Sequence, residues 1–198
     1  MSKVHNLNAT QSTKPIKATT NILLHGDGEI PGVCFVDYRD ESQLDDVMSL
    51  VGRDLSEPYS IFTYRYFLHR FPELCILAVS EDAPDEPIGC VVGKVDDEER
   101  LYVAGGASDT TSTSKVGYLG MLAVGQSYRR RGIGKELVRK ILQRMKDMGC
   151  DSVILETEVT NRTAQQLYQD CFGFVREELL VRYYLNWNDA YRLRLWFV

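Results

Sequence analysis

The segment Arg129-Arg-Arg-Gly-Ile-Gly-Lys135 separates an apolar run, Tyr118 to Val124, from a strongly amphipathic stretch, Gly132 to Met148. The run predicts a strand, and the stretch predicts a helix because its apolar residues recur at helical spacing. Glycines in the turn let the backbone curl so that successive N–H groups point into one space. The helix N-terminus adds partial positive charge. This arrangement suits a pyrophosphate, and an ordinary basic turn before a surface helix is the alternative.

Two common nucleotide-binding loops do not fit this turn. No G-x-x-x-x-G-K-[ST] sequence occurs, which excludes a Walker loop. Gly132-Ile-Gly134 lacks the third glycine or alanine of a dinucleotide-binding turn. We therefore expect a different phosphate-bearing cofactor, bound by Arg129, Arg130, Arg131, Gly132, Ile133, Gly134 and Lys135, with the basic side chains adding charge-assisted contacts.

The rest of the chain alternates strands and helices, which indicates an α/β or α+β domain over residues 33–198. Residues 1–32 are polar and indicate a flexible arm, and residues 96–115 indicate a mobile surface loop. Further strands are expected at 33–38, 74–80, 88–95, 152–158, within 172–185 and at 191–197. Further helices are expected at 42–55, 60–71 and 162–171.

Composition narrows the class of protein. The 198 residues carry a net charge of −5, which disfavours general nucleic-acid binding because phosphates require a basic face. No secretory signal opens the chain, and no apolar run approaches membrane-spanning length. The five cysteines have neither C-x-x-C nor zinc spacing, so we expect reduced core thiols, no metal site and a cytoplasmic location.

Two motifs in order give a family resemblance. R-x-x-G-x-G after an apolar strand resembles the acetyl-CoA signature of the GNAT acetyltransferases. Asn161-Arg-Thr-Ala-Gln-Gln-Leu-Tyr168, followed by Gly173-Phe174, resembles their second motif. This chain has four residues, Gln169 to Phe172, between the tyrosine and the Gly-Phe pair, where the family usually has three. The resemblance implies a GNAT fold: a mixed sheet of about seven strands, about four flanking helices, and a splayed strand pair that holds the pantetheine of acetyl-CoA.

Shorter segments narrow the resemblance to N-terminal acetyltransferases of the NatC type, over residues 33–198. They are residues 56–60, 64–66, 120–124, 155–158 and 182–186. This resemblance implies transfer of acetyl from acetyl-CoA to nascent chains that begin with Met and a bulky apolar residue. It also implies a large scaffold subunit, a small third subunit and ribosome association through that complex, with no direct nucleic-acid or membrane partner.

The expected chemistry requires a base, an oxyanion donor and a proton donor. Tyr168 is the candidate proton donor for the leaving thiolate, with packing at a helix end as the alternative. The resemblance implies main-chain contacts to acetyl and pantetheine from Leu122, Ala123 and Val124, and a cofactor contact from Asn161. An N–H near Leu122 is expected to bind the oxyanion.

Glu156 and Glu158 share one strand face, because strand side chains alternate. Two neighbouring carboxylates among apolar residues suit a base, although either could face solvent. The resemblance favours Glu156.

Substrate contacts are expected from a helix–helix turn and from the chain near the last hairpin. Glu57 binds the amine or else caps the next helix through Pro58. Tyr59, Tyr183 and Tyr184 are expected to clamp the peptide, and Tyr118 matches a tyrosine that is catalytic in some relatives. Core packing is the alternative for each tyrosine.

Three functions remain open: an N-terminal acetyltransferase, a GNAT enzyme acting on lysine or a small amine, and a catalytically silent acyl-CoA-binding assembly subunit. The tyrosine-rich segment 182–186 favours the first, because its resemblance to N-terminal acetyltransferases implies a final hairpin that covers the peptide groove and excludes an internal lysine.

Overall fold

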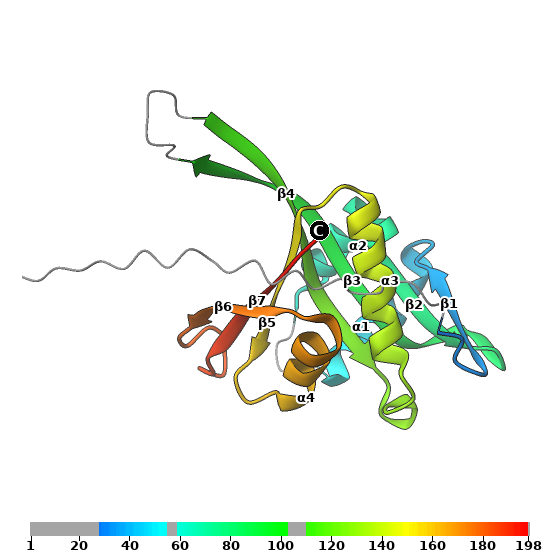
Figure 1. Ribbon diagram of the computed structural model, residues 1–198. Helices are drawn as coiled ribbons and strands as arrows, with labels where there is room; N and C mark the ends of the chain where they lie inside the picture. The colour runs from blue at the N-terminus through cyan, green and yellow to red at the C-terminus, as the bar shows by residue number, and fades with distance from the viewer. Residues whose placement is uncertain (1–27, 55–58, 103–109, 198) are drawn as a thin grey trace, which may run out of the picture.

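The computed structural model describes residues 28–54, 59–102 and 110–197, which build one mixed seven-stranded sheet (Figure 1). The strand order is β1 (Val33–Asp37), β2 (Cys75–Ser80), β3 (Ala83–Tyr102), β4 (Thr110–Val124), β5 (Ser152–Glu158), β7 (Ala190–Trp196) and β6 (Val175–Leu180). Among the strand pairs of the described residues, β4–β5 is parallel and the other five are antiparallel. The sheet and its four α-helices confirm the expected fold class.

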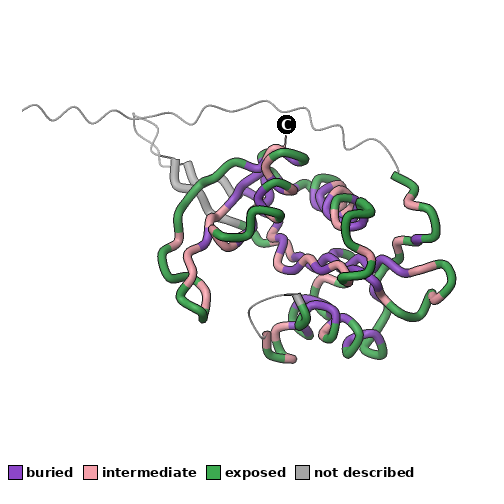
Figure 2. Tube along the Cα trace, turned by 90° about the horizontal axis from the view of Figure 1, so that it is seen from below, coloured by how far each residue is buried: buried purple, intermediate pink, exposed green. Residues whose placement is uncertain are grey.

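Helices cover both faces of the sheet. The helices α1 (Leu44–Asp54) and α2 (Ile61–Arg70) lie on one face, while α3 (Ile133–Asp147) and α4 (Arg162–Gln165) lie on the other. The alternation of β2 makes this division possible, because Ile76 packs toward α3 and Leu77 toward α1. Figure 2 shows the buried segments turned inward between the sheet and the helices on its two sides.

The helix α3 forms as its sequence predicts. Leu137, Ile141, Leu142 and Met145 are fully buried on one stripe, and charged residues occupy the outer face. Gly132 precedes the helix with φ 88°, a left-handed conformation that glycine adopts without steric cost. The helix therefore has a fixed start directly beside the end of β4.

The parallel pair separates soon after it begins. The strands β4 and β5 pair only at Val116–Ser152, Gly117–Val153 and Tyr118–Ile154, although both continue beyond this point. Gly120 is an extra residue in the β3–β4 register, because Leu119 pairs with Gly93 while Met121 already pairs with Val92. This bulge bends β4 where the strands part, and it produces the expected splay.

The prediction of a loop over residues 96–115 is largely wrong. The strand β3 runs to Tyr102 and β4 starts at Thr110, and the two keep an unbroken register from Val95–Gly117 to Tyr102–Thr110. The acidic and Gly/Ser/Thr-rich composition indicated a loop, but the paired strands β3 and β4 extend as a ribbon beyond the rest of the sheet (Figure 1). The strand expected at 88–95 also begins earlier, because β3 starts at Ala83 and leaves only a short turn after β2.

The extra residue before Gly173 is absorbed by a π-helical segment. The helix expected at 162–171 begins as α4 and continues as η4 (Gln166–Cys171), with Tyr168 inside η4. A π-turn accommodates one inserted residue within a helix. Gln165 fixes its start, since its side-chain amide donates to the main-chain oxygens of Glu158 (3.1 Å) and Val159 (2.8 Å).

Several expectations concern the chain ends and the cysteines. Residues 1–27 of the arm expected over residues 1–32 lie outside the described residues. The end of that range contacts the domain, because Arg131 donates to the main-chain oxygen of Pro31 at 3.3 Å. Cys75, Cys90 and Cys150 are buried as expected, whereas Cys34 and Cys171 are exposed at the surface. Within the described ranges, no helix has the length and apolar character needed to span a membrane.

Candidate active site

A cavity of about 650 Å³ occupies the region where β4 and β5 diverge. It extends from the N-terminus of α3, along the inner edge of β4, to α4 and the end of β5. Of the expected site residues, Tyr59, Leu122, Val124, Arg129, Arg130, Gly132, Ile133, Gly134, Lys135, Glu156, Asn161, Tyr168 and Tyr184 line it. Residues far apart in the sequence thus surround one space.

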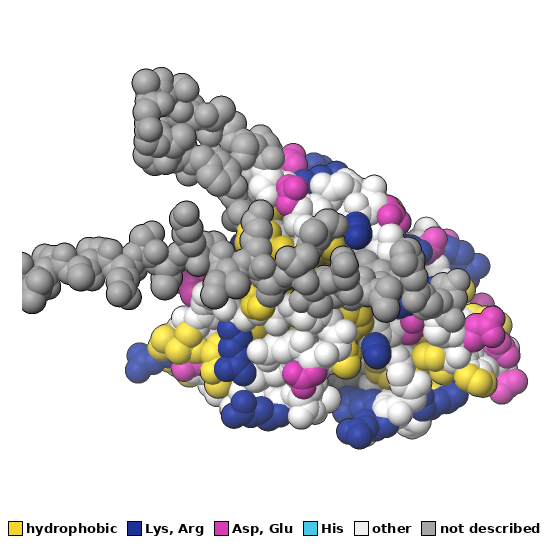
Figure 3. Space-filling view, viewed as in Figure 1, with side chains coloured by type: hydrophobic (Ala, Val, Ile, Leu, Met, Phe, Trp, Pro, Cys, Tyr) yellow, Lys and Arg dark blue, Asp and Glu magenta, His cyan; other side chains and the backbone are white. Residues whose placement is uncertain are grey.

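One end of the cavity has the features of an anion site. The first intrahelical bond of α3 runs from Glu136 N–H to Gly132 oxygen, so the N–H groups of Ile133, Gly134 and Lys135 are not used by the helix. Arg130 has φ 65° and Gly132 has φ 88°, so the approaching backbone is strongly curled. Figure 3 shows Lys and Arg side chains gathered over the loop that joins β4 to α3.

The loop arginines have different roles in the structure. The Arg129 side chain donates from Nε to Val124 oxygen at 3.0 Å and also lines the cavity. Arg131, which was expected at the cofactor, instead lies over the Tyr128 ring and contacts Pro31. Three adjacent arginines cannot all face one ligand, because the curled backbone directs them differently.

The inner edge of β4 offers main-chain groups to the cavity. Gly125 N–H donates to Ile88 oxygen of the β3 side at 2.8 Å. Because successive strand residues direct their N–H and C=O groups to alternate sides, Ala123 also faces β3, while Leu122 and Val124 face the gap. Ala123 does not line the cavity, and its side chain is buried in the core beneath α1. Leu122 N–H is therefore placed to meet a ligand between the strands.

This part of the cavity fits acetyl-CoA. A Cβ built on Gly134 would lie 3.6 Å from Val124 Cγ2, at ordinary contact distance, and would project into the wall of the cavity. The glycine thus leaves room for phosphates against the helix N-terminus. The diverging edge of β4 supplies main-chain partners for the amides of a pantetheine arm.

Tyr168 closes the same region from η4. Its ring packs edge-on to Phe174, with 5.7 Å between the ring centres, and the residue is only 6% exposed. Burial raises the pKa of Tyr168, so the phenol keeps its proton at neutral pH. Asn161 caps α4 by accepting from Ala164 N–H at 3.0 Å, which gives it a structural contact in addition to its place in the cavity wall.

Glu156 is the most buried carboxylate of the cavity, with a side chain 6% exposed. Its Oε1 accepts from Arg192 Nε at 3.0 Å. Its Oε2 is buried and has no hydrogen-bond partner among the described residues. The Glu156 carboxylate in turn raises the pKa of Arg192. One oxygen is thus held by an ion pair while the other is available to a donor.

Tyrosines surround this carboxylate. Burial, and then the neighbouring Glu156 charge, raises the pKa of Tyr118. Burial also raises the pKa of Tyr184, which lines the cavity. Tyr183 packs edge-on to Tyr184 at 5.1 Å but is itself 45% exposed and outside the cavity wall. Tyr118 likewise lies beside the cavity rather than in its wall. Glu57 and Pro58 lie outside the described residues.

Glu158 connects the cavity to the loop between β6 and β7. Its Oε1 accepts from Asn186 Nδ2 at 3.1 Å, and its Oε2 accepts from Thr160 Oγ1 at 3.2 Å. Glu156 instead lies beside the Tyr118 hydroxyl and accepts a hydrogen bond from the Arg192 cation. The two carboxylates therefore share a face, as their spacing predicts, and Glu156 is paired with Arg192 across the sheet.

The sequence interpretation missed several wall residues and one partner. The missed wall residues are Leu119, Gly120, Tyr128, Thr157, Thr163, Ala164 and Leu167. The missed partner is Arg192, which faces Glu156 directly across the β5–β7 pair. Only the strand register reveals this pairing, since 35 residues separate the two positions in the chain.

The match to known proteins agrees with this geometry. Residues 44–174 match the Acetyltransferase (GNAT) family, and the chain belongs to that family. Within it, the chain is 45% identical to N-alpha-acetyltransferase 30 of Xenopus laevis and 43% identical to N-alpha-acetyltransferase 30 of Saccharomyces cerevisiae. These alignments cover 87% and 81% of this chain.

Coverage of the relatives themselves differs. The chain spans 62% of the Xenopus laevis relative and 42% of a Homo sapiens relative of the same name, but 85% of the Saccharomyces cerevisiae one. A solved structure, the NatC complex bound to Gag peptide and CoA, contains a similar chain with a TM-score of 0.75 and 39% identity. That match covers 84% of this chain and 99% of the other.

Proposed function

We propose that this protein is an N-terminal α-amino acetyltransferase that uses acetyl-CoA. One observation carries the proposal: a single cavity joins a helix N-terminus suited to phosphates, an open strand edge and a buried carboxylate. Acetyl-CoA would supply the acetyl group as a thioester. Ile133, Gly134 and Lys135 would hold its phosphates through main-chain N–H groups, while Arg129 and Arg130 add positive charge.

The amine must lose a proton before it attacks. The reference pKa of an α-amine is about 7.7–8.0, so a useful fraction is neutral near physiological pH. Oε2 of Glu156, which has no hydrogen-bond partner among the described residues, would accept the proton that the amine nitrogen gives up in the reaction, directly or through one water. The Arg192 ion pair at Oε1 keeps the carboxylate in one orientation during this transfer.

The other two groups act on the thioester. Leu122 N–H faces the gap and would donate to the carbonyl oxygen as negative charge develops there. Tyr168 would donate its proton to the departing sulfur, since burial keeps the phenol protonated. The α-amine nitrogen gains the acetyl group, the sulfur gains a proton, and the proton from the amine leaves through Glu156.

The proposed substrates are chains that begin with Met and a bulky apolar residue. Aromatic rings of Tyr59 and Tyr184 line the cavity near Glu156 and offer apolar area at this end. Tyr183 would contact the chain farther out, where it is exposed. The names of the relatives support protein N-termini as the acceptor class, and the solved complex is described as bound to a peptide.

The proposed partners follow from the same similarity. The solved relative belongs to a complex, so we propose that this chain works in a multi-subunit assembly with a large scaffold subunit and a small third subunit. We also propose a cytoplasmic location, with access to nascent chains through ribosome association of that assembly.

A peptide panel tests the proposal. Acetyl transfer from acetyl-CoA is measured on peptides with a free N-terminus, on the same peptides with a blocked N-terminus and an internal lysine, and on small amines. We expect acetylation of free N-termini only. Acetylation of the blocked lysine peptide would identify a lysine acetyltransferase, and acetyl-CoA binding without transfer would identify an assembly subunit.

A further inference from the structure

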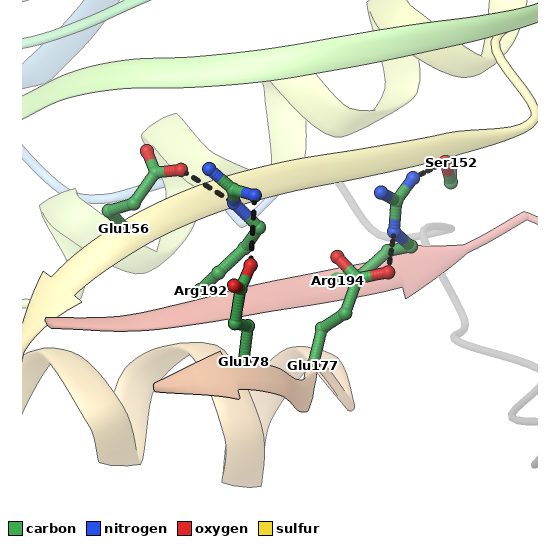
Figure 4. A network of polar contacts seen from close by, with 6 residues as sticks. All are labelled: Ser152, Glu156, Glu177, Glu178, Arg192 and Arg194. Atoms are coloured by element: carbon green, nitrogen blue, oxygen red, sulfur yellow. Dashed lines mark hydrogen bonds and ion pairs between the residues drawn. The ribbon is translucent and has the colours of Figure 1, made fainter. Parts of the chain in front are cut away.

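Two parallel rows of polar side chains cross the strands β5, β7 and β6 (Figure 4). One row joins Glu156 to Arg192 and Arg192 to Glu178. The other joins Ser152 to Arg194 and Arg194 to Glu177. Arg192 and Arg194 share a face because they are two residues apart on β7. The rows are therefore nearly identical in chemistry and differ in what lies at the inner end.

The two rows end at different places inside the molecule. Arg194 Nη1 donates to the fully buried hydroxyl of Ser152 at 3.0 Å, in the interior of the sheet. Arg192 Nε donates to the Glu156 carboxylate at 3.0 Å, in the cavity wall. Only the Arg192 row therefore connects the surface of the sheet to the proposed reaction centre.

Arg192 is held at two points. Its Nε contacts Glu156 and its Nη1 contacts Glu178 Oε2 at 3.2 Å, so the planar guanidinium has a defined orientation. This orientation occupies Oε1 of Glu156 and leaves Oε2 for the amine. A buried carboxylate without such a partner would favour its protonated form, which cannot accept a proton.

Other groups also face Glu156. They are Tyr118 from β4, Tyr184 from the β6–β7 loop with Tyr183 packed against it, Tyr59 before α2, and Glu158 on β5 itself. The tyrosines are neutral at physiological pH, and Glu158 is acidic. Arg192 is thus the cation among the described residues that lies against the Glu156 carboxylate.

We propose that Arg192 is a positioning residue for the reaction: it keeps Glu156 ionised and turns its free oxygen toward the substrate amine. This inference rests on the proposed function, because it assumes that Glu156 receives the proton. It assigns Arg192 no direct contact with either substrate.

The central experiment compares Arg192→Gln and Arg192→Lys with wild type in pH–rate profiles on a Met-Leu peptide. In Arg192→Gln, kcat/KM for the peptide should fall about 10- to 100-fold at pH 7 through misplacement and protonation of the base. The KM for acetyl-CoA should not change. The acid-side limb should move to higher pH, so that activity partly recovers under alkaline conditions. Arg192→Lys keeps the charge and should restore most of the limb position.

Arg194→Gln is the matched control, because it removes the same group from the neighbouring row. It should lower thermal stability, since Arg194 is 5% exposed, yet leave the acid-side limb in place. Glu178→Gln is a milder variant that removes only the outer contact of Arg192 and should retain the wild-type limb. If Arg192→Gln shows the wild-type limb, or if Arg194→Gln moves it equally, the positioning role is refuted.

A second readout separates this inference from the proposed function. The Glu156 side-chain carboxyl is followed by ¹³C NMR during a pH titration of wild type and Arg192→Gln, with Glu156→Gln used to assign the signal. The carboxyl should keep its proton to higher pH in Arg192→Gln. Identical titrations would overturn the inference even in an active enzyme. Absence of transfer to any peptide would instead refute the proposed function.

Discussion

Gly132, which precedes α3, and Gly134, in the first turn of that helix, should respond oppositely to the same substitution. Gly132 has φ 88°, and a Cβ there meets only Ile30 Cδ1 at 3.7 Å. Gly132→Ala therefore creates no clash but forces a side chain into the left-handed region, at a cost of roughly 1–2 kcal/mol. For a chain of this size, each kcal/mol lowers Tm by about 2–4 °C, so we expect a loss of about 2–8 °C.

Gly134 should show the converse behaviour. A Cβ there lies 3.6 Å from Val124 Cγ2, so Gly134→Ala should leave Tm unchanged or slightly raised. The new methyl group lies in the cavity wall beside the N–H groups that we assign to phosphate. Loss of one hydrogen bond to a charged group costs about 1.5–3 kcal/mol, which corresponds to roughly a 10- to 100-fold weaker Kd.

Both variants are measured in the same way, by scanning calorimetry without ligand and by titration calorimetry with acetyl-CoA. Unchanged acetyl-CoA affinity in folded Gly134→Ala would refute the assignment of this turn to the phosphates. An unchanged Tm in Gly132→Ala would refute the conformational argument for the start of α3.

Four further outcomes are expected. Tyr168→Phe should lower kcat by about 10²- to 10⁴-fold without changing acetyl-CoA affinity in calorimetry; an unaltered kcat would make Tyr168 a packing residue. Glu156→Gln should abolish most activity and the acid-side limb of the pH–rate profile, and a persisting limb would place the base elsewhere. In a competition assay, a Met-Leu peptide should be acetylated roughly 10- to 100-fold faster than a Met-Asp peptide, because burying a large apolar side chain contributes about 1.5–3 kcal/mol; equal rates would contradict the substrate class. Burial raises the pKa of Tyr38 and Tyr64 to about 12, so the unfolded chain ionises first above pH 10. Each phenol should then reduce the free energy of unfolding by about 1.4 kcal/mol per pH unit between pH 10 and 12, measurable by denaturant titration; stability independent of pH in this range would contradict their burial.

Local patterns predicted most of the fold. The helical spacing of Ile133, Leu137 and Ile141 fixed both the position of α3 and its buried face, and β5 has the predicted bounds. These elements were predictable because each carries its own apolar periodicity. The ribbon beyond Val95 was not predictable, because its acidic and Gly/Ser/Thr-rich sequence carries no strand periodicity and the pairing of β3 with β4 is what defines it.

The candidate site was predictable where a motif spans a few consecutive residues. It was less predictable where the site depends on pairing between strands that are distant in the sequence. The turn at Gly132 and the second motif at Tyr168 both lead to the cavity. Arg192 could not be recognised, because its meaning comes from the β5–β7 register. Ala123 and Arg131 lie outside the cavity wall for a related reason: a strand alternates the direction of its main-chain groups, and the curled loop directs neighbouring side chains differently.

The π-helical segment η4 has a consequence for how this protein tolerates change in length. An inserted residue in an ordinary helix would rotate everything after it by about 100°, which would carry Phe174 out of the core or Tyr168 out of the cavity. The wide turn takes up that rotation locally, because Gln165 holds one end against β5 and Phe174 N–H returns to Tyr168 oxygen at the other. The segment thus accommodates a change of one residue in helix length without displacing its neighbours. Removing Gln169 should therefore convert it to a regular α-helix and leave Tyr168 in place.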